Sequence, residues 1–117
     1  ITGVGASNAL GAVVQVSGTG SNATTVSVTN GVLDFQAGVQ GTGDFAKTGA
    51  GTLTISGASS GFTGSASINA GTVRLAASGG GALQSASSVT VGAGAILVVS
   101  QSNQINDTAS ITLSGGT

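Results

Sequence analysis

KTGAGTLTISGASSGFTGSASINAGTVRL, residues 47–75, contains two near-copies of one phrase, GTLTI and GTVRL. The phrases begin at Gly51 and Gly71, so they lie twenty residues apart. In each phrase, aliphatic residues alternate with more polar ones, which is the period-two pattern of a β-strand with one buried face. A strand phrase that returns at a fixed interval indicates a repeat architecture.

The same interval organises most of the chain. The glycine anchors are Gly11, Gly31, Gly51, Gly71, Gly94 and Gly116, separated by steps of twenty and, at the end, of twenty-three and twenty-two. Two positions after the first five anchors stand the aliphatic residues Val13, Leu33, Leu53, Val73 and Ile96. Four positions after the same glycine anchors stand Gln15, Phe35, Ile55, Leu75 and Val98. We expect both sets to point inward and the residues between them to point outward, namely Val14, Asp34, Thr54, Arg74 and Leu97.

A second strand is predicted before the anchors, with inward residues five and three positions upstream. These residues are Val26 and Val28, Ala66 and Ile68, Val89 and Val91, and Ile111 and Leu113. The copy before Gly51 departs from this pattern, because Phe45 and Lys47 are shifted by one residue from the strict offsets. The copy before Gly11, Ala6 and Asn8, matches the apolar pattern only weakly. Gln15 either starts a polar ladder or marks a first coil registered differently, with Val14 and Val16 inward. The remaining variable stretch has room for a third strand.

These patterns predict an all-β fold, a parallel β-solenoid of about 5–6 coils of 20–23 residues, in which residues 1–117 form a single segment. Gly supplies the positive φ values that tight corners need. An antiparallel sandwich is the competing architecture. It gives no reason for a near-constant interval, and its core normally uses more aromatics than Phe35, Phe45 and Phe62, which we expect to fill core or corner gaps.

Composition excludes several classes of function. Only 4% of residues are charged, against about 25% in an average domain, and the net charge is −1. A chain with no basic footprint is not suited to neutralising phosphates, so we expect no nucleic-acid partner. The absence of cysteine rules out a disulfide framework and a thiolate metal site. No apolar run approaches 18 residues, so we expect no membrane insertion by this segment.

The sequence predicts no catalytic, cofactor-binding or metal-binding residue, and we expect no enzyme activity. Gly41–Asp44 resembles a calcium loop only faintly, because a calcium-binding β-roll repeats its Gly/Asp unit. Asp34, Asp44 and Asp107 are spread over different coils, whereas glycosidases need paired carboxylates. The chain has no His to act as a base. Ice-binding solenoids use regular rows of outward-facing threonines. We expect no such row here, because Asp34 and Arg74 flank Thr54 in the outward column.

The stretch Phe45–Leu75 resembles the passenger-associated repeat of autotransporter proteins, which belongs to the secreted part of type V secretion systems. The matching pieces are KTGAGTL (residues 47–53), SG (56–57), FTG (62–64) and NAGTV (69–73). Phe62 replaces the usual Tyr and Val73 the usual Leu. The resemblance implies a right-handed parallel β-helix, located extracellularly or on the bacterial outer surface, within a larger parent that ends in an outer-membrane barrel.

Neither end of the chain shows a cap such as an amphipathic helix or a Lys or Pro gatekeeper, and open ends of stacked strands promote association. The absent initiator Met favours a fragment of a longer secreted chain. Two functions follow as expectations. One is a non-catalytic rigid stalk or adhesin scaffold, with a host or surface adhesion target as a partner. The other is a subunit of an extracellular filament, whose partners are solenoid coils of the same or another copy stacked end to end or laterally.

Overall fold

The protein folds into three parallel sheets, described by a computed structural model for residues 2–3, 5 and 7–117. The first sheet contains, in order, β1 (Thr2–Gly3), β4 (Thr24–Val28), β7 (Phe45–Thr48), β9 (Ser65–Ile68), β11 (Ser88–Val91) and β13 (Ser110–Leu113). The second contains β2 (Ser7–Leu10), β5 (Val32–Phe35), β8 (Thr52–Ile55), β10 (Thr72–Leu75) and β12 (Ile96–Val99). The third pairs β3 (Val14–Gln15) with β6 (Val39–Gln40).

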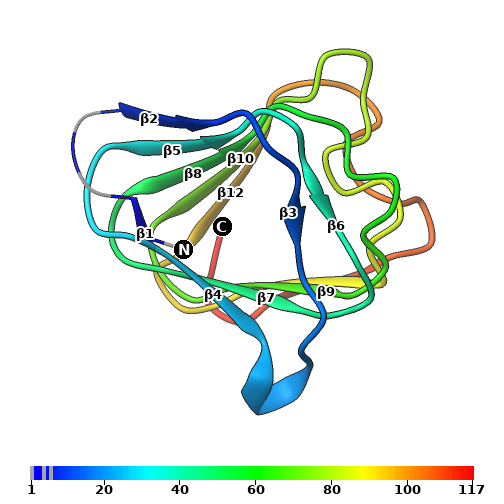
Figure 1. Cartoon of the computed structure of the whole chain (residues 1–117). Coiled ribbons are helices and arrows are strands. Elements are labelled where there is room, and N and C mark those ends of the chain that lie inside the picture. Colours follow the sequence, from blue (N-terminus) through cyan, green and yellow to red (C-terminus); the bar gives the residue numbers. More distant parts are fainter. Residues whose placement is uncertain (1, 4, 6) are drawn as a thin grey trace.

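The chain visits the three sheets in turn, so each circuit stacks on the previous one as a coil (Figure 1). Every strand pair is parallel. Leu33, Leu53 and Val73 lie side by side on β5, β8 and β10, as the repeat predicted. The isolated parallel bridges Gly41–Phe62 and Leu83–Ile105 continue the third side of the coil beyond β6. The predicted parallel β-solenoid with a third strand segment is therefore confirmed.

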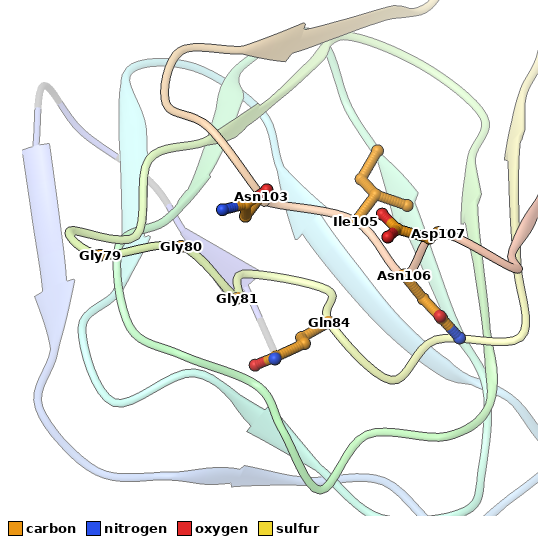
Figure 2. Close-up of a pocket in the computed structure, with 8 residues that line it drawn as sticks. All are labelled: Gly79, Gly80, Gly81, Gln84, Asn103, Ile105, Asn106 and Asp107. Atoms are coloured by element: carbon orange, nitrogen blue, oxygen red, sulfur yellow. The ribbon is translucent and has the colours of Figure 1, made fainter.

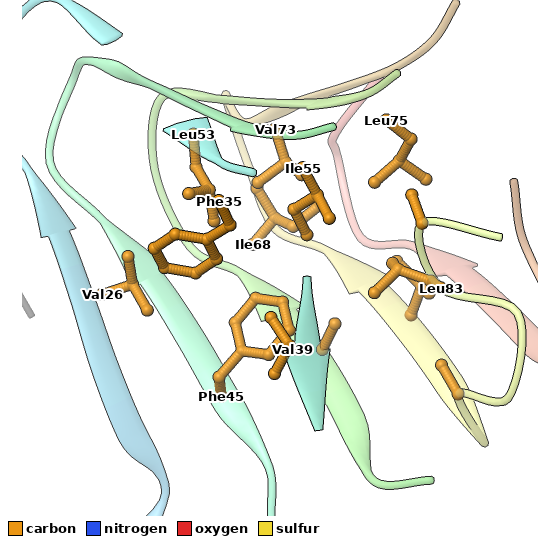
Figure 3. Close-up of a cluster of buried hydrophobic side chains, with 14 of the residues drawn as sticks. Val26, Phe35, Val39, Phe45, Leu53, Ile55, Ile68, Val73, Leu75 and Leu83 are labelled. Carbon is orange, nitrogen blue, oxygen red and sulfur yellow. The ribbon is translucent and has the colours of Figure 1, made fainter. Parts of the chain in front are cut away.

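The core is a narrow stack of aliphatic side chains, among which Figure 3 shows Phe35 and Phe45. Phe35, Phe45 and Phe62 are buried, and the rings of Phe45 and Phe62 lie 5.4 Å apart at a tilt of 44°. Tilted aromatic pairs at this separation are favourable beyond their buried area. The prediction that these residues fill the core is confirmed.

The first coil differs from the prediction. Gly11 is not equivalent to Gly31, because it is Ser7–Leu10 that pairs with Val32–Phe35. The predicted inward residue Val13 is exposed. Val14 and Val16 are buried, as the alternative interpretation of Gln15 expected, but they belong to the third side of the coil, where β3 pairs with β6. The 3₁₀ turn η1 (Gly20–Asn22) lies in the segment that lengthens this coil.

The last coil is shifted by one residue from the prediction. Leu97 stacks beside Val73 and Val99 beside Leu75, so Ile96 and Val98 lie in the outward columns. The corner before β12 holds one more residue than the corner before β10. It is closed by a bond from the Ala95 N–H to the Gly92 carbonyl, 3.0 Å. Gly94 is therefore not the equivalent of Gly71, a position that Ala95 occupies.

The first sheet also departs from the predicted columns at two strands. Val26 lies beside Lys47 and Lys47 beside Ile68, so Val26 is not equivalent to Ala66. Phe45 and Lys47 point inward and are buried, whereas Ala46, at the strict offset, is half-buried. Ala6 of the weak first copy lies outside the described residues, and Asn8 belongs to β2 in the second sheet. No helix within the described ranges has the length and hydrophobicity that a membrane crossing requires.

Candidate functional site

Lys47 is a fully buried cation at a corner between the first and second sheets. Its Nζ donates hydrogen bonds to the carbonyl oxygens of Thr48 at 2.9 Å, Gly49 at 2.8 Å and Ala70 at 3.0 Å. Backbone carbonyls at a corner leave the strand ladder and need other donors. The ammonium therefore supplies three donors at once and joins two successive coils. Burial lowers the pKa of Lys47 below its usual value of 10.5.

The Lys47 corner requires glycine on the coil beside it. Gly71 has φ +70°, and a Cβ there would lie 2.7 Å from the Lys47 Nζ and would also collide with the carbonyl oxygens of Gly49 and Gly51. Gly49 has φ +80°. The left-handed backbone and the close approach of two coils are both conditions that only glycine meets without strain.

Asp34 lies on β5 and Asp44 in the loop before β7, and each bonds to a residue of a neighbouring coil. Asp44 accepts the N–H of Ser65 at 2.8 Å and that of Gly20 at 3.4 Å. Asp34 accepts the hydroxyl of Ser56 at 2.7 Å. No group of three acidic, His or Cys side chains forms among the described residues. The Gly41–Asp44 loop thus uses its carboxylate on backbone amides, which ties successive coils together.

An open polar hollow of about 340 Å³ lies between loops of two successive coils (Figure 2). Gly79–Gly81 and Gln84 form one side, and Asn103 and Ile105–Asp107 form the other, with the Gly81 N–H donating to the Asn103 carbonyl at 2.7 Å. Asn103 has φ +55°, a left-handed backbone conformation that asparagine tolerates at corners. The lining offers amides, backbone and a single carboxylate, which is hydrogen-bonding chemistry without an acid–base pair.

Gln104 is a buried polar residue whose role the sequence did not reveal. Its Oε1 accepts the Ala77 N–H at 2.8 Å, and its Nε2 donates to the Ala77 carbonyl at 3.0 Å and the Ser102 carbonyl at 2.9 Å. The side-chain amide thus acts like one residue of a strand and pairs with the backbone of the previous coil. Ser59 plays a comparable part, since its buried Oγ accepts the Val39 N–H at 2.9 Å.

The C-terminal end of the stack is an apolar surface. Val99, Ile111 and Leu113 are 51%, 52% and 59% exposed. They lie beside the fully buried residues Leu75, Val89 and Val91 respectively, in the same inward columns. We call these three side chains the C-terminal face. Each inner coil has the equivalent surface covered by the coil that follows it.

The Lys47 corner and the glycines packed against it lie within residues 47–71. Residues 45–75 match the family model of the passenger-associated-transport-repeat. The match spans 31 of the 117 residues and coincides with the stretch that resembles an autotransporter passenger. No curated protein and no solved structure matches the chain.

The structure gives several residues of the passenger-associated-transport-repeat a physical role. Lys47 bonds the corner carbonyls, and Phe62 is fully buried against Phe45. A Cβ at Gly57 or Gly64 would collide with the backbone of the preceding coil, at the Gln36 and Gly43 carbonyls respectively. The repeat therefore describes how consecutive coils contact each other.

Proposed function

We propose that the chain is a non-catalytic, rigid β-solenoid segment of a bacterial secreted or surface-exposed passenger, acting as a stalk or adhesin scaffold. The supporting observation is the match of residues 45–75 to a passenger repeat inside a stack of parallel coils. Coils joined by continuous parallel ladders make a stiff body, because bending it would break strand pairing on one side. The body measures 34 × 30 × 28 Å.

A surface-display experiment tests this role. The chain is placed between an epitope tag and the barrel of an autotransporter in a Gram-negative host, and the tag is probed on intact cells. We expect the tag on the surface and a protease-resistant fragment that contains the chain. A matched variant, Leu53→Asp, places a charge in the core and should lose the resistant fragment. A wild-type chain that is degraded as readily as this variant contradicts the stalk role.

The non-catalytic part of the proposal has its own test. Purified chain is incubated with a panel of neutral and acidic polysaccharides, and reducing ends and unsaturated products are measured. We expect no turnover above the level of the Asp34→Asn, Asp44→Asn and Asp107→Asn variants. Turnover that one of these substitutions abolishes would show that a carboxylate is catalytic.

A second candidate function is assembly into an extracellular filament through end-to-end stacking. One observation favours it, the exposure of Val99, Ile111 and Leu113 at the C-terminal face. Exposed strand edges with apolar side chains are sites of association unless they are covered. Concentration-dependent fibres in negative-stain micrographs of the purified chain support this candidate, and a monomer at all concentrations favours the stalk alone.

A further inference from the structure

We propose that Asn22 is the residue at which the folded chain accepts an N-linked sugar, and that Asn106 is closed to the same modification. The sequence contains two Asn-x-Ser/Thr sequons, NAT (residues 22–24) and NDT (residues 106–108). This motif is the acceptor for N-glycosylation, which requires a surface position. The inference goes beyond the stalk and filament functions and depends on neither of them.

The asparagine of the first sequon lies in an insertion, residues 19–23, at the corner between the third and the first sheet. The backbone pairing of the first two coils runs to Gly18, whose carbonyl accepts the Asp44 N–H at 2.8 Å. The pairing resumes at Thr24, which lies beside Phe45. The insertion leaves the ladder between these two points. Figure 1 shows it as a lobe that projects beyond the corner between β3 and β4.

The exposure of Asn22 follows from this insertion and not from the place of the first coil in the chain. The first coil turns the corner with residues 16–23, whereas the second coil turns it with residues 41–44 alone. Repeats of a solenoid stack along their ladders. A coil stacked on either side therefore meets Gly18 and Thr24 rather than the projecting residues. No residue of η1 is buried, and Asn22 itself is exposed.

The side-chain amide of Asn22 is available because backbone bonds hold the turn. The Asn22 N–H donates to the Thr19 carbonyl at 2.9 Å, and the Ala23 N–H donates to the Gly20 carbonyl at 3.2 Å. Within the described part of the chain, the Asn22 side chain makes no hydrogen bond. Ala23 has an extended backbone, with φ −58° and ψ 145°, and leads into Thr24 at the start of β4. A sugar on Asn22 would therefore displace no contact.

Asn106 is half-buried, and both ends of its amide are engaged. Its Nδ2 donates to the Ala86 carbonyl of the preceding coil at 3.2 Å. Its Oδ1 accepts the backbone N–H of Thr108 at 3.2 Å and the hydroxyl of Thr108 at 3.1 Å. Ala86 is fully buried, so a sugar on the Asn106 Nδ2 would have to enter the contact between two coils. The structure thus separates two sequons that look equivalent in the sequence.

The modification needs a separate glycosyltransferase and an activated sugar, for which a nucleoside diphosphate hexose is suitable. The Asn22 Nδ2 bonds to the anomeric carbon, and the bond from that carbon to the diphosphate breaks. The nucleoside diphosphate leaves with the electron pair, and the amide gives one proton to a base of the enzyme. In a chain with a net charge of −1, an attached sugar supplies bulk and hydration that charge does not. We expect it to keep neighbouring solenoids from packing side by side.

The test uses the purified, folded chain with UDP-glucose and a soluble bacterial N-glucosyltransferase that recognises the sequon. The product is denatured and cut with trypsin. Lys47 and Arg74 are the two basic residues, so residues 1–47 and 75–117 each carry one sequon. We expect mass spectrometry to find one hexose on residues 1–47 and none on residues 75–117. A folded chain without sugar on residues 1–47 overturns the proposal, and so does equal occupancy of the two fragments.

Matched variants at the same turn separate sequon recognition from a non-specific surface reaction. Asn22→Gln and Thr24→Ala should each abolish the modification, whereas Thr24→Ser keeps the sequon and should retain it. A Thr24→Ala chain that is still modified contradicts the assignment. Urea denaturation of the modified chain supplies an independent readout. We expect the same midpoint as for the unmodified chain, and a lower midpoint would show that Asn22 belongs to the packed structure and overturn the proposal.

Discussion

The Nζ of Lys47 lies 3.0 Å from the carbonyl oxygen of Ala70, twenty-three residues away in the chain. The two residues belong to successive coils, so a side chain on one coil completes the backbone hydrogen bonding of the next. Lys47 occupies a column that is otherwise aliphatic, between Val26 and Ile68. A buried ammonium is accommodated there because three carbonyl oxygens surround it, and no carboxylate is bonded to it in the described structure.

Lys47→Met should destabilise the fold, because it removes three donors while keeping the apolar stem. Leaving buried polar groups without partners costs about 1–3 kcal/mol each, and removing the burial penalty of the charge offsets part of that loss. We expect a net loss of roughly 1–3 kcal/mol in the free energy of unfolding, measured by urea denaturation. Arg74→Met is the matched control, since Arg74 is exposed and its Nε donates to the Ser100 Oγ at 3.3 Å. Equal losses in the two variants would contradict a special role for Lys47.

The stability of the wild-type protein should rise with pH as Lys47 loses its proton. Burial lowers the pKa of Lys47 in the folded state below the 10.5 expected in the unfolded chain. Between these two values the unfolded chain binds more protons, so the free energy of unfolding increases with pH. The neutral amine retains two N–H donors for the corner carbonyls.

This pH dependence can be isolated because the chain contains no Tyr, Cys or His. Urea denaturation between pH 8 and 10.5, the pKa of Lys47 in the unfolded chain, should show a free energy of unfolding that rises with pH for wild type and stays constant for Lys47→Met. A wild-type profile that falls over this interval, while the variant stays flat, would mean that the corner carbonyls favour the charged amine more than burial opposes it.

Sequence periodicity predicted the middle of the solenoid correctly because the inward and outward residues differ in kind there. In GTLTI and GTVRL, only the aliphatic positions suit a dry core. The last coil contains Ile96–Val99, four consecutive aliphatic residues, so alternation does not distinguish the inward pair from the outward pair. The one-residue shift comes from a longer corner, which hydrogen bonding of Ala95 to Gly92 reveals only in the structure.

The first coil was misplaced for a related reason. Val13, Val14 and Val16 fit two alternating patterns, and the extra residues around η1 make this coil longer than the others. The role of Lys47 at the corner was not predicted, for a different reason. Its spacing from Phe45 already placed it on the inward face of the strand, but a charged side chain gives no sign in the sequence of which carbonyls it will meet. Those carbonyls come from two coils, so only the fold brings them together.

Gly71→Ala should cost much more stability than Gly94→Ala. Both glycines have similar positive φ values, +70° and +76°, so the backbone strain of adding a Cβ is alike, about 1–2 kcal/mol. A Cβ at Gly94 meets no atom within 4 Å, whereas one at Gly71 collides with backbone carbonyls and the Lys47 Nζ. We expect a loss of roughly 3 kcal/mol or more at Gly71. Thermal denaturation followed by circular dichroism measures the difference, and similar melting temperatures would show that the corner relaxes freely.

Gln104→Met should loosen the loops around the polar hollow without unfolding the repeat segment. The substitution keeps the length of the buried side chain but leaves the Ala77 N–H and the Ser102 carbonyl without the amide that pairs with them, whereas the Ala77 carbonyl keeps the Gly80 N–H at 3.0 Å. Each unpaired group costs about 1–3 kcal/mol, so the local loss is comparable to that of Lys47→Met. The Leu83–Ile105 bridge lies next to this contact, and β8 and β10 lie within continuous ladders. Hydrogen exchange should therefore accelerate at Ala77 and in residues 79–84, while Thr52–Ile55 remains protected. Gln101→Met, at an exposed position of the same loop, should leave both regions unchanged, and faster exchange at Thr52–Ile55 in Gln104→Met would mean that the coils unfold as a single unit.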